Sequence, residues 1–271
     1  RIAAQLSSKA PRPSQDFENE IIRIIQAGSR MERAKWLKKM RSNAEALYDR
    51  FSPRYWVSWG LTEDETHQQY LQQFLQRVAP GGAILSAACG AGRYDGALLE
   101  AGHPVLGIDQ SAGVLARAKE HFPQAQYQKM ALQEMTFREA FDGVICMDAL
   151  EHICPEDYPG ILRGFQESLK PGGLLYFTAD REEEPDFDLE FYYERARAAG
   201  LPVVFGEVAD EAAFEQAMTQ DDVSDELTDR ATYHYYPPLA KVRAWIEQAG
   251  LAIEAEGAGS GFHHFLARKL P

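Results

Sequence analysis

The fold of this 271-residue chain can be inferred from one stretch, Ile84-Leu-Ser-Ala-Ala-Cys-Gly-Ala-Gly-Arg93. Its first half is a short apolar run of the kind that forms a buried strand, and its second half holds Gly90 and Gly92. Glycine has no Cβ, so the backbone there can turn sharply and lie against a ligand. Asp109 follows at the end of the next apolar run, where a carboxylate can accept both hydroxyls of a ribose. The pattern predicts a ribose-containing ligand at the ends of two neighbouring strands.

Strand and helix signals alternate around this stretch. Strands are expected at 83–88, 104–108, 125–129, 141–147 and 173–178, and helices at 64–78, 92–101, 111–121 and 155–169. This alternation predicts an α/β fold with a doubly wound, parallel sheet. A last helix at 239–249 precedes two closely joined strands, 251–256 and 262–268, which must therefore be antiparallel.

Composition and pattern divide the chain into four expected parts. These are an N-terminal helical cap at 1–60, an α/β core at 61–179, an acidic insert at 180–236, and a C-terminal helix and β-hairpin at 237–271. Within the cap, residues 17–48 show a helical pattern, and the aromatic-rich stretch 48–59 is expected to be a loop.

Acidic residues are concentrated in one segment. The chain has 41 acidic and 28 basic residues, a net charge of −13, and residues 180–230 alone hold 17 acidic and 4 basic ones. Nucleic acid is excluded as a main partner because binding through phosphates needs clustered Lys and Arg. As a lid beside a substrate site, the acidic segment would disfavour anionic substrates. A surface appendage or a dimerisation element is the alternative.

Cysteine usage and hydropathy indicate a cytoplasmic protein. Three cysteines give an odd number without the spacing of a disulfide framework. No apolar run approaches the roughly 20 residues of a membrane-spanning helix, and the N-terminus lacks the apolar core of a signal peptide. We therefore expect no membrane partner.

Four motifs in order resemble the class I S-adenosylmethionine-dependent methyltransferase family. They are the opening stretch, Gly107-Ile-Asp-Gln-Ser111, Phe141-Asp-Gly-Val-Ile-Cys-Met-Asp-Ala-Leu-Glu-His152 and Leu169-Lys-Pro-Gly-Gly-Leu-Leu175. A dinucleotide fingerprint fits poorly because Asp95 stands where its third glycine would be. The resemblance covers roughly 80–179 and 238–268. It implies a Rossmann-like, mostly parallel seven-stranded sheet whose last strand is antiparallel.

The resemblance also implies a ligand and a reaction. S-adenosylmethionine would be the methyl donor and S-adenosylhomocysteine the product, with transfer to O or N of a small organic molecule. The implied cofactor-binding residues are Ser86, Ala88, Gly90, Gly92, Asp109, Gln110, Met130, Ala131, Leu132 and Met147.

Three of these positions depart from the family pattern. Ser86 and Ala131 stand where acidic residues are common, and Ala88 replaces a frequent glycine. A lost charge-assisted hydrogen bond costs about 1.5–3 kcal/mol. In the alternative interpretation, the glycines only make a tight turn and Asp109 only caps the helix that starts near Ser111.

Candidate groups for substrate chemistry follow the fourth strand and precede the last helix. His152 and His234 are the candidate bases, since a hydroxyl acceptor must lose a proton. Expected acceptor-binding residues are Tyr48, Tyr55, Asp148, Tyr192, Tyr235 and Tyr236. His152 could equally anchor its loop. Asp148, Glu151 and His152 offer metal donors within one helical turn, but without a second histidine nearby no metal site is expected.

Two readings compete with simple methyl transfer. One is a non-standard S-adenosylmethionine-dependent enzyme that performs a cyclisation or rearrangement. The other is a degenerate methyltransferase fold that serves as a binding partner. A homodimer is left open, and of the pair His263-His264, which points to opposite faces of a strand, neither is expected to be catalytic.

Overall fold

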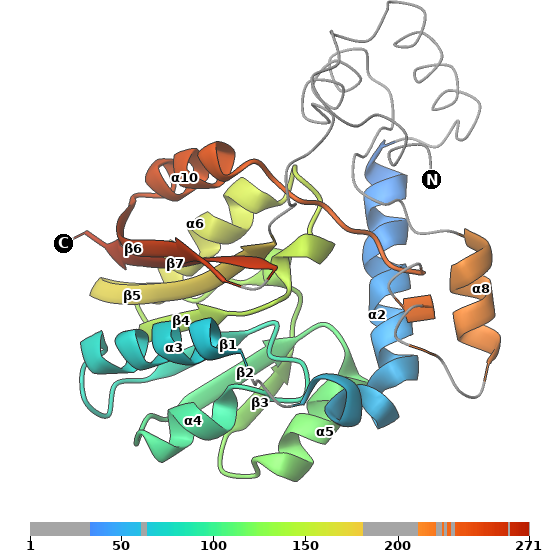
Figure 1. Ribbon diagram of the computed structural model, residues 1–271, viewed down its shortest axis with the longest axis horizontal. Coiled ribbons are helices and arrows are strands. Elements are labelled where there is room, and N and C mark those ends of the chain that lie inside the picture. Colours follow the sequence, from blue (N-terminus) through green and yellow to red (C-terminus); the bar gives the residue numbers. More distant parts are fainter. Residues whose placement is uncertain are drawn as a thin grey trace, which may run out of the picture.

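A seven-stranded sheet forms the centre of the computed structural model (Figure 1). From one edge to the other the strands are β3 (Gln126–Lys129), β2 (Val105–Asp109), β1 (Ile84–Ala87), β4 (Phe141–Cys146), β5 (Leu169–Asp180), β7 (Phe262–Lys269) and β6 (Leu251–Ala258). The structure describes residues 33–60, 64–180, 211–220, 224, 227–228, 231–259 and 261–270.

Strand directions agree with the predicted topology. The five strands from β3 to β5 are parallel, β7 runs antiparallel to β5, and β6 runs antiparallel to β7. The order doubles back at β1, because the chain moves outward to β3 and then returns to place β4 on the other side of β1. Such a reversal opens a crevice at the carboxyl ends of the strands.

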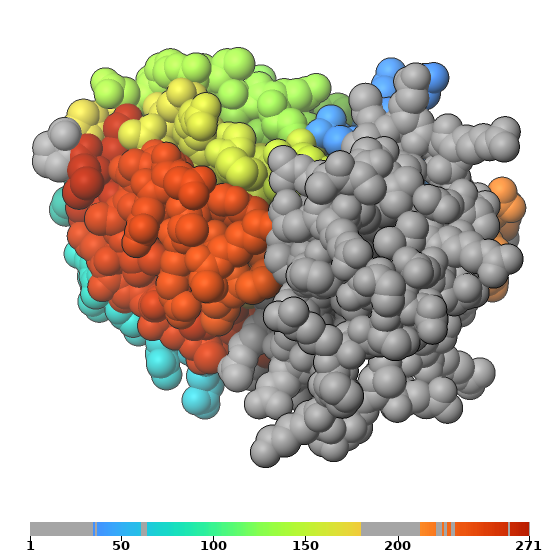
Figure 2. All heavy atoms as spheres, turned by 90° about the horizontal axis from the view of Figure 1, so that it is seen from above, coloured from blue at the N-terminus to red at the C-terminus, as the bar shows by residue number. Residues whose placement is uncertain are grey.

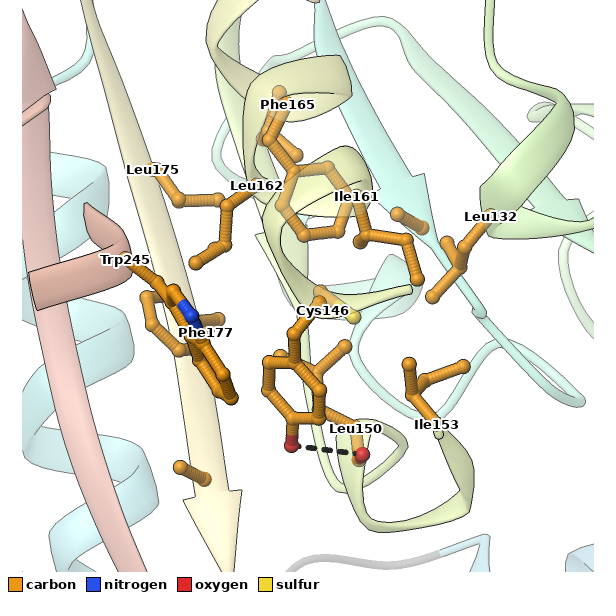
Figure 3. Packing of buried hydrophobic residues seen from close by; sticks show 14 of the residues in the cluster. Leu132, Cys146, Leu150, Ile153, Ile161, Leu162, Phe165, Leu175, Phe177 and Trp245 are labelled. Atoms are coloured by element: carbon orange, nitrogen blue, oxygen red, sulfur yellow. Dashed lines mark hydrogen bonds between the residues drawn. The ribbon is translucent and has the colours of Figure 1, made fainter. Parts of the chain in front are cut away.

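Helices cover both faces of the sheet. They are α3 (Glu65–Arg77), α4 (Asp95–Glu100), α5 (Ala112–His121), α6 (Tyr158–Ser168) and α10 (Leu239–Gln248). Successive strand residues enter opposite cores: Leu175 packs with α6 and α10, whereas Leu174 packs with α3 and α4. Figure 3 shows the first of these cores, and Figure 2 shows the surface that α10 and α6 form above it. The central strands are therefore buried on both sides.

Three predicted elements have different bounds in the structure. The helix expected at 92–101 begins at Asp95, because Gly90 and Gly92 have φ angles of +54° and +83° and cannot continue a right-handed helix. The strand expected at 173–178 runs from Leu169 to Asp180 and shifts register opposite Phe141 and Gly143. The helix expected at 155–169 spans Tyr158–Ser168.

The stretch 48–59, predicted as a loop, is the last part of the helix α2 (Arg33–Trp59). Pro53 lies inside this helix and cannot donate a hydrogen bond to the carbonyl of Asp49. The hydroxyl of Ser52 donates to that carbonyl instead, at 2.8 Å. The prediction of a loop was wrong because a local side chain replaces the missing backbone donor.

Helix α2 lies at the carboxyl ends of the strands (Figure 1), and polar side chains fasten it there. Arg41 forms a bidentate pair with Asp157, with its shortest contact at 2.6 Å. Glu45 accepts from Nζ of Lys129 at 2.5 Å. Asp49 accepts from the Ser111 hydroxyl and from the backbone N–H of Gly113, at 2.6 and 2.8 Å. Three consecutive turns of α2 are thus tied to the sheet side of the molecule.

The described part of the acidic insert packs against α2. Helix α8 (Glu211–Thr219) lies beside α2 in Figure 1, and its Ala213 and Ala217 share a core with Leu47 and Phe51. Residues 181–210, which include Tyr192, lie outside the described residues. The three cysteines are free thiols. Within the described ranges, no helix is both long and apolar enough to cross a membrane.

Candidate functional site

Two adjoining cavities lie where β1, β2 and β4 end. The narrow cavity, of about 80 Å³, is lined among others by Gly90, Asp109, Gln110, Met130, Ala131 and Leu132. The wide cavity, of about 470 Å³, is lined among others by Ser86, Met147, His234 and Tyr236. Both share the walls Tyr48, Tyr55, Ala88, Asp148 and His152. The topology thus brings most of the predicted site residues together.

Asp109 ends β2 with its carboxylate held by backbone amides. Oδ2 accepts from the N–H of Gly90 at 3.0 Å and Oδ1 from that of Ser111 at 2.9 Å. Burial raises the pKa of Asp109 to about 6, against the opposing effect of these amides. Ser111, and not Asp109, caps α5 by accepting from the N–H of Val114. The carboxylate therefore joins the loop that contains Gly90 and Gly92, here called the glycine loop, to α5, and it also lines the narrow cavity.

Glycine-loop positions differ in what they do. A Cβ on Gly90 would come within 2.4 Å of the Tyr55 hydroxyl, so Gly90 lets this ring approach the loop. Gly92 lines neither cavity; a Cβ there would come within 3.0 Å of Asp95 and of Phe122. Gly92 thus shapes the turn behind the cavities. Ala88 has a φ of +49°, a conformation that suits glycine better.

Gln133 is a wall residue of the narrow cavity that the sequence analysis missed. Its Nε2 donates to Oδ2 of Asp157 at 3.1 Å. Because a carboxylate only accepts, this bond fixes the orientation of the amide and leaves its oxygen as an acceptor. Gln133 therefore offers an acceptor two residues from Ala131, where the family pattern has an acid. The sequence shows that residue 133 is a glutamine, but the orientation of its amide depends on Asp157, which lies 24 residues away.

Ser86 lies beside a buried acid. Its side chain, 3% exposed, hydrogen-bonds to Asp95, which also accepts from the Tyr127 hydroxyl at 3.0 Å. Burial raises the pKa of Asp95 to about 6, and the hydroxyls of Ser86 and Tyr127 partly offset this effect. Asp95 thus supplies a carboxyl group behind position 86, where the family pattern has its own.

His152 lies at the boundary between the two cavities, in the 3₁₀ helix η3 (Leu150–His152). This segment is fixed by the Tyr158 hydroxyl, which donates to the carbonyl of Leu150 at 2.8 Å (Figure 3). Nδ1 of His152 lies 3.1 Å from the carbonyl of Tyr233, and Nε2 lies 2.8 Å from the Tyr48 hydroxyl. A carbonyl only accepts, so Nδ1 carries hydrogen and Nε2 of the neutral ring is basic.

The segment before α10 contributes part of the wide cavity. His234 and Tyr236 line it, and the His234 ring lies 4.8 Å from that of His152 between centroids. Tyr235 lines neither cavity: it is 3% exposed and packs in the core beside Tyr158. Neighbouring residues of this extended segment face opposite sides, so only alternate ones reach the cavity.

Asp148, expected to bind the acceptor, is surrounded by donors from the protein. Oδ1 accepts from Nε2 of His67 and the Thr178 hydroxyl at 2.9 and 3.0 Å, and Oδ2 accepts from Arg93 and the Tyr94 hydroxyl, both at 2.8 Å. Burial alone would raise the pKa of Asp148, but the hydrogen bond and charge of His67, with Arg93, lower it. Four donors fill the usual capacity of a carboxylate, so Asp148 is suited to positioning its neighbours.

His67 and His264 lie behind this carboxylate. Nδ1 of His67 lies 2.9 Å from Oδ1 of Asp64, so the ring bridges two carboxylates, and despite burial its hydrogen bonds to Asp148 and Asp64 raise its pKa. Burial and the charge of His67 lower the pKa of His264 to about 4. His264 is fully buried, whereas its neighbour His263 packs beside Glu256. No sequence signal links His67 to Asp148, which lies 81 residues away.

The core of the chain matches a known family. Residues 84–173 match the family model described as a methyltransferase domain. The sequence is 34% identical over 114 residues to an uncharacterised methyltransferase of Synechocystis sp., covering 42% of this chain and 53% of that protein. It is 27% identical over 193 residues to a ubiquinone biosynthesis O-methyltransferase of Xanthomonas axonopodis pv. citri, covering 68% and 69%. The chain spans about half the length of the first of these relatives.

Solved structures share the fold. The 1,6-didemethyltoxoflavin-N1-methyltransferase of Burkholderia thailandensis, solved with 1,6-didemethyltoxoflavin and S-adenosylhomocysteine, matches with a TM-score of 0.54 and 15% identity over 97% of this chain and 94% of its own. An S-adenosylmethionine-dependent methyltransferase of Mesorhizobium loti matches with a TM-score of 0.53 and 21% identity over 74% and 96%. At this identity the likeness concerns the fold.

Proposed function

Because residues 84–173 form a methyltransferase domain of the class I S-adenosylmethionine-dependent type, we propose that the chain transfers a methyl group from this donor to O or N of a small organic molecule. One observation carries the proposal. Asp109, Gly90 and the segment from Met130 to Leu132 line one cavity, and this cavity shares the wall around His152 with a second, wider one. Donor and acceptor would therefore meet at His152.

The residues present fit the donor. Asp109 would accept the ribose hydroxyls, and Met130, Leu132 and the amide oxygen of Gln133 would surround the adenine. Arg93 lines the wide cavity and is held by Asp148, so its guanidinium could bind the methionine carboxylate. Tyr48 and Tyr55 stand at the boundary of both cavities. These rings, or α2 as a whole, would move when the donor binds.

When bound, S-adenosylmethionine supplies an activated methyl group, so the protein must mainly hold the acceptor in line. Nε2 of His152 would take the proton that an acceptor hydroxyl loses, while the carbonyl of Tyr233 keeps the ring oriented through Nδ1. The Tyr48 hydroxyl, 2.8 Å from Nε2, would yield this position to the acceptor or relay its proton. An amine or ring nitrogen would need no such base.

The wide cavity favours a flat acceptor. Aromatic side chains form much of its wall: Tyr48, Tyr55, Trp59, Tyr94, Tyr236 and Phe262. Such rings pack against planar molecules, while His152 and His234 add polar atoms. We expect aromatic hydroxyl or ring-nitrogen compounds to be better acceptors than aliphatic ones. The acidic insert would disfavour polyanionic acceptors, so better turnover of a polyanion than of its neutral analogue would contradict this part.

Calorimetric titration with S-adenosylmethionine tests the proposal. We expect one binding site per chain and no binding by Asp109→Ala. Asp142→Asn is the matched control and should bind normally, because Asp142 lies at the start of β4 and bonds to Ala83 and Lys170. Absence of binding at millimolar donor would refute both enzyme readings and leave the binding-partner reading. Binding together with a product other than a methylated acceptor, detected by mass spectrometry, would favour cyclisation or rearrangement.

A further inference from the structure

A cluster behind the wide cavity is not used by the proposed reaction. Asp64 precedes α3, His67 lies in the first turn of α3, and His264 lies in β7. One potential metal-ligating atom of each lies within 4.8 Å of the others. The two histidines are 3% and 0% exposed, and their ring centroids are 4.6 Å apart. The fold therefore converges two imidazoles and one carboxylate from distant parts of the sequence.

His264 has a buried ring nitrogen, Nε2, that the described residues leave without a hydrogen bond. The Tyr176 hydroxyl donates to the carbonyl of His67 at 3.4 Å, and its oxygen lies 3.0 Å from Nδ1 of His264. The Tyr176 oxygen can accept from Nδ1 of His264 while its own hydrogen goes to the carbonyl, and in this tautomer Nε2 has a lone pair. Among the described residues, nothing hydrogen-bonds to this buried Nε2. A buried acceptor without a partner is costly, and a cation would satisfy it.

His67 is oriented as metal-bound histidines are. Its Nε2 donates to Oδ1 of Asp148 at 2.9 Å, which turns Nδ1 toward Asp64. Histidines that bind metal commonly donate their other N–H to a carboxylate, which fixes the ring and makes the ligand more basic. Asp148 is itself held by Arg93, Tyr94 and Thr178. The arrangement thus already contains the outer support of a metal site.

We propose that Asp64, Nδ1 of His67 and Nε2 of His264 bind one divalent transition-metal ion, for which Zn²⁺ is the best match. Two imidazoles and a carboxylate are a common zinc ligand set. The ion would replace the proton that Nδ1 of His67 otherwise shares with Asp64. It would tie α3 to β7 and hold Asp148, and through it Arg93, at the wall of the wide cavity. The ion has a positioning role, and the proposal does not depend on methyl transfer.

Metal binding to the full chain, stripped with a chelator and dialysed, tests the proposal directly. Titration with Co²⁺ should give visible d–d bands that saturate at one ion per chain and are displaced by Zn²⁺, without a thiolate charge-transfer band. Zn²⁺ should also raise the melting temperature. Asp64→Asn and His264→Gln should each weaken binding at least about tenfold, the lower bound known for loss of a supporting residue.

Matched variants identify the site. His103→Gln, in which a buried histidine bonded to the carbonyl of Gly82 is changed, should bind as the unaltered chain does. Asp64→Asn keeps an N-cap for α3, so it remains informative if His264→Gln does not fold. The proposal would be overturned if metal binding did not saturate, or if a thiolate charge-transfer band appeared. It would also be overturned if metal affinity were unchanged in both Asp64→Asn and His264→Gln, or if His152→Gln were the variant that lost metal binding.

Discussion

The hydroxyl of Tyr48 lies 2.8 Å from Nε2 of His152, and this contact joins α2 to the loop after β4 at the boundary of the two cavities. The partners are 104 residues apart, and the Tyr233 carbonyl holds the other ring nitrogen. Both sides of the imidazole are thus positioned by separate parts of the chain. This pair is where the proposed chemistry can be tested most directly.

His152→Gln should lower kcat for a hydroxyl acceptor by about 10²–10⁴-fold, the usual contribution of a general base. Its effect on a ring-nitrogen acceptor should be much smaller, because such an atom needs no base. Steady-state kinetics with a matched pair of acceptors measure the difference, and His103→Gln serves as the control. Equal losses for both acceptors would mean that His152 only anchors its loop.

Binding of S-adenosylmethionine should weaken as the pH falls from 8 to 5. Burial raises the pKa of Asp109 to about 6, so its carboxylate is ionised above that pH and protonated below it. Only the ionised form can accept both ribose hydroxyls. Asp109→Asn should bind about ten- to hundredfold more weakly at pH 8, and the pH dependence should disappear. Calorimetry at several pH values measures the affinity and its pH dependence for both proteins. If the affinity of Asp109→Asn changed with pH as that of the unaltered chain does, Asp109 would not be the group that binds the ribose.

Gln133→Ala should remove recognition of the adenine amino group. A neutral hydrogen bond contributes about 0.5–1.5 kcal/mol, so affinity for S-adenosylhomocysteine should fall about two- to tenfold. The sharper readout uses S-inosylhomocysteine, which has an oxygen in place of that amino group. The unaltered chain should prefer the adenosyl compound, and Gln133→Ala should bind both alike. A preference that persists in the variant would place the recognition elsewhere.

Asp95→Asn should stabilise the fold at pH 8. In the native chain burial raises the pKa of Asp95 to about 6, against about 3.9 when unfolded. The native state then binds the extra proton between these values, so the stability of the unaltered chain falls as the pH rises through this interval. Urea unfolding should show a gain of up to about 3 kcal/mol at pH 8 that shrinks toward pH 4. Asp142→Asn, at a paired carboxylate, should not show this gain.

The sheet could be predicted from the sequence because its signals are local. Apolar runs and turn glycines mark each strand, and the short connection between β6 and β7 requires opposite directions. The end of α2 could not, because Ser52 satisfies the carbonyl that Pro53 leaves open. The roles of Gly92 and Tyr235 could not be predicted either. Each stands next to cavity-lining residues in the sequence but packs against the protein interior.

Site residues whose orientation depends on distant partners could not be predicted from the sequence either. His67 lies in a polar helix segment that shows no motif, and its importance arises only when Asp148 comes within 2.9 Å. Gln133 gains a defined orientation only from Asp157. A single sequence therefore predicts which strand ends form the crevice better than it predicts which side chains are held in it.

The fastening of α2 has a kinetic consequence. Arg41, Glu45 and Asp49 tie this helix down over the cavity that would hold the donor, so exchanging spent donor for fresh requires breaking ion pairs as well as moving aromatic rings. Movement of α2 away from the cavity would then be the rate-limiting step of turnover, slower than methyl transfer itself. Partly exposed ion pairs weaken with salt. An enzyme built this way would run faster, up to a point, as ionic strength rises.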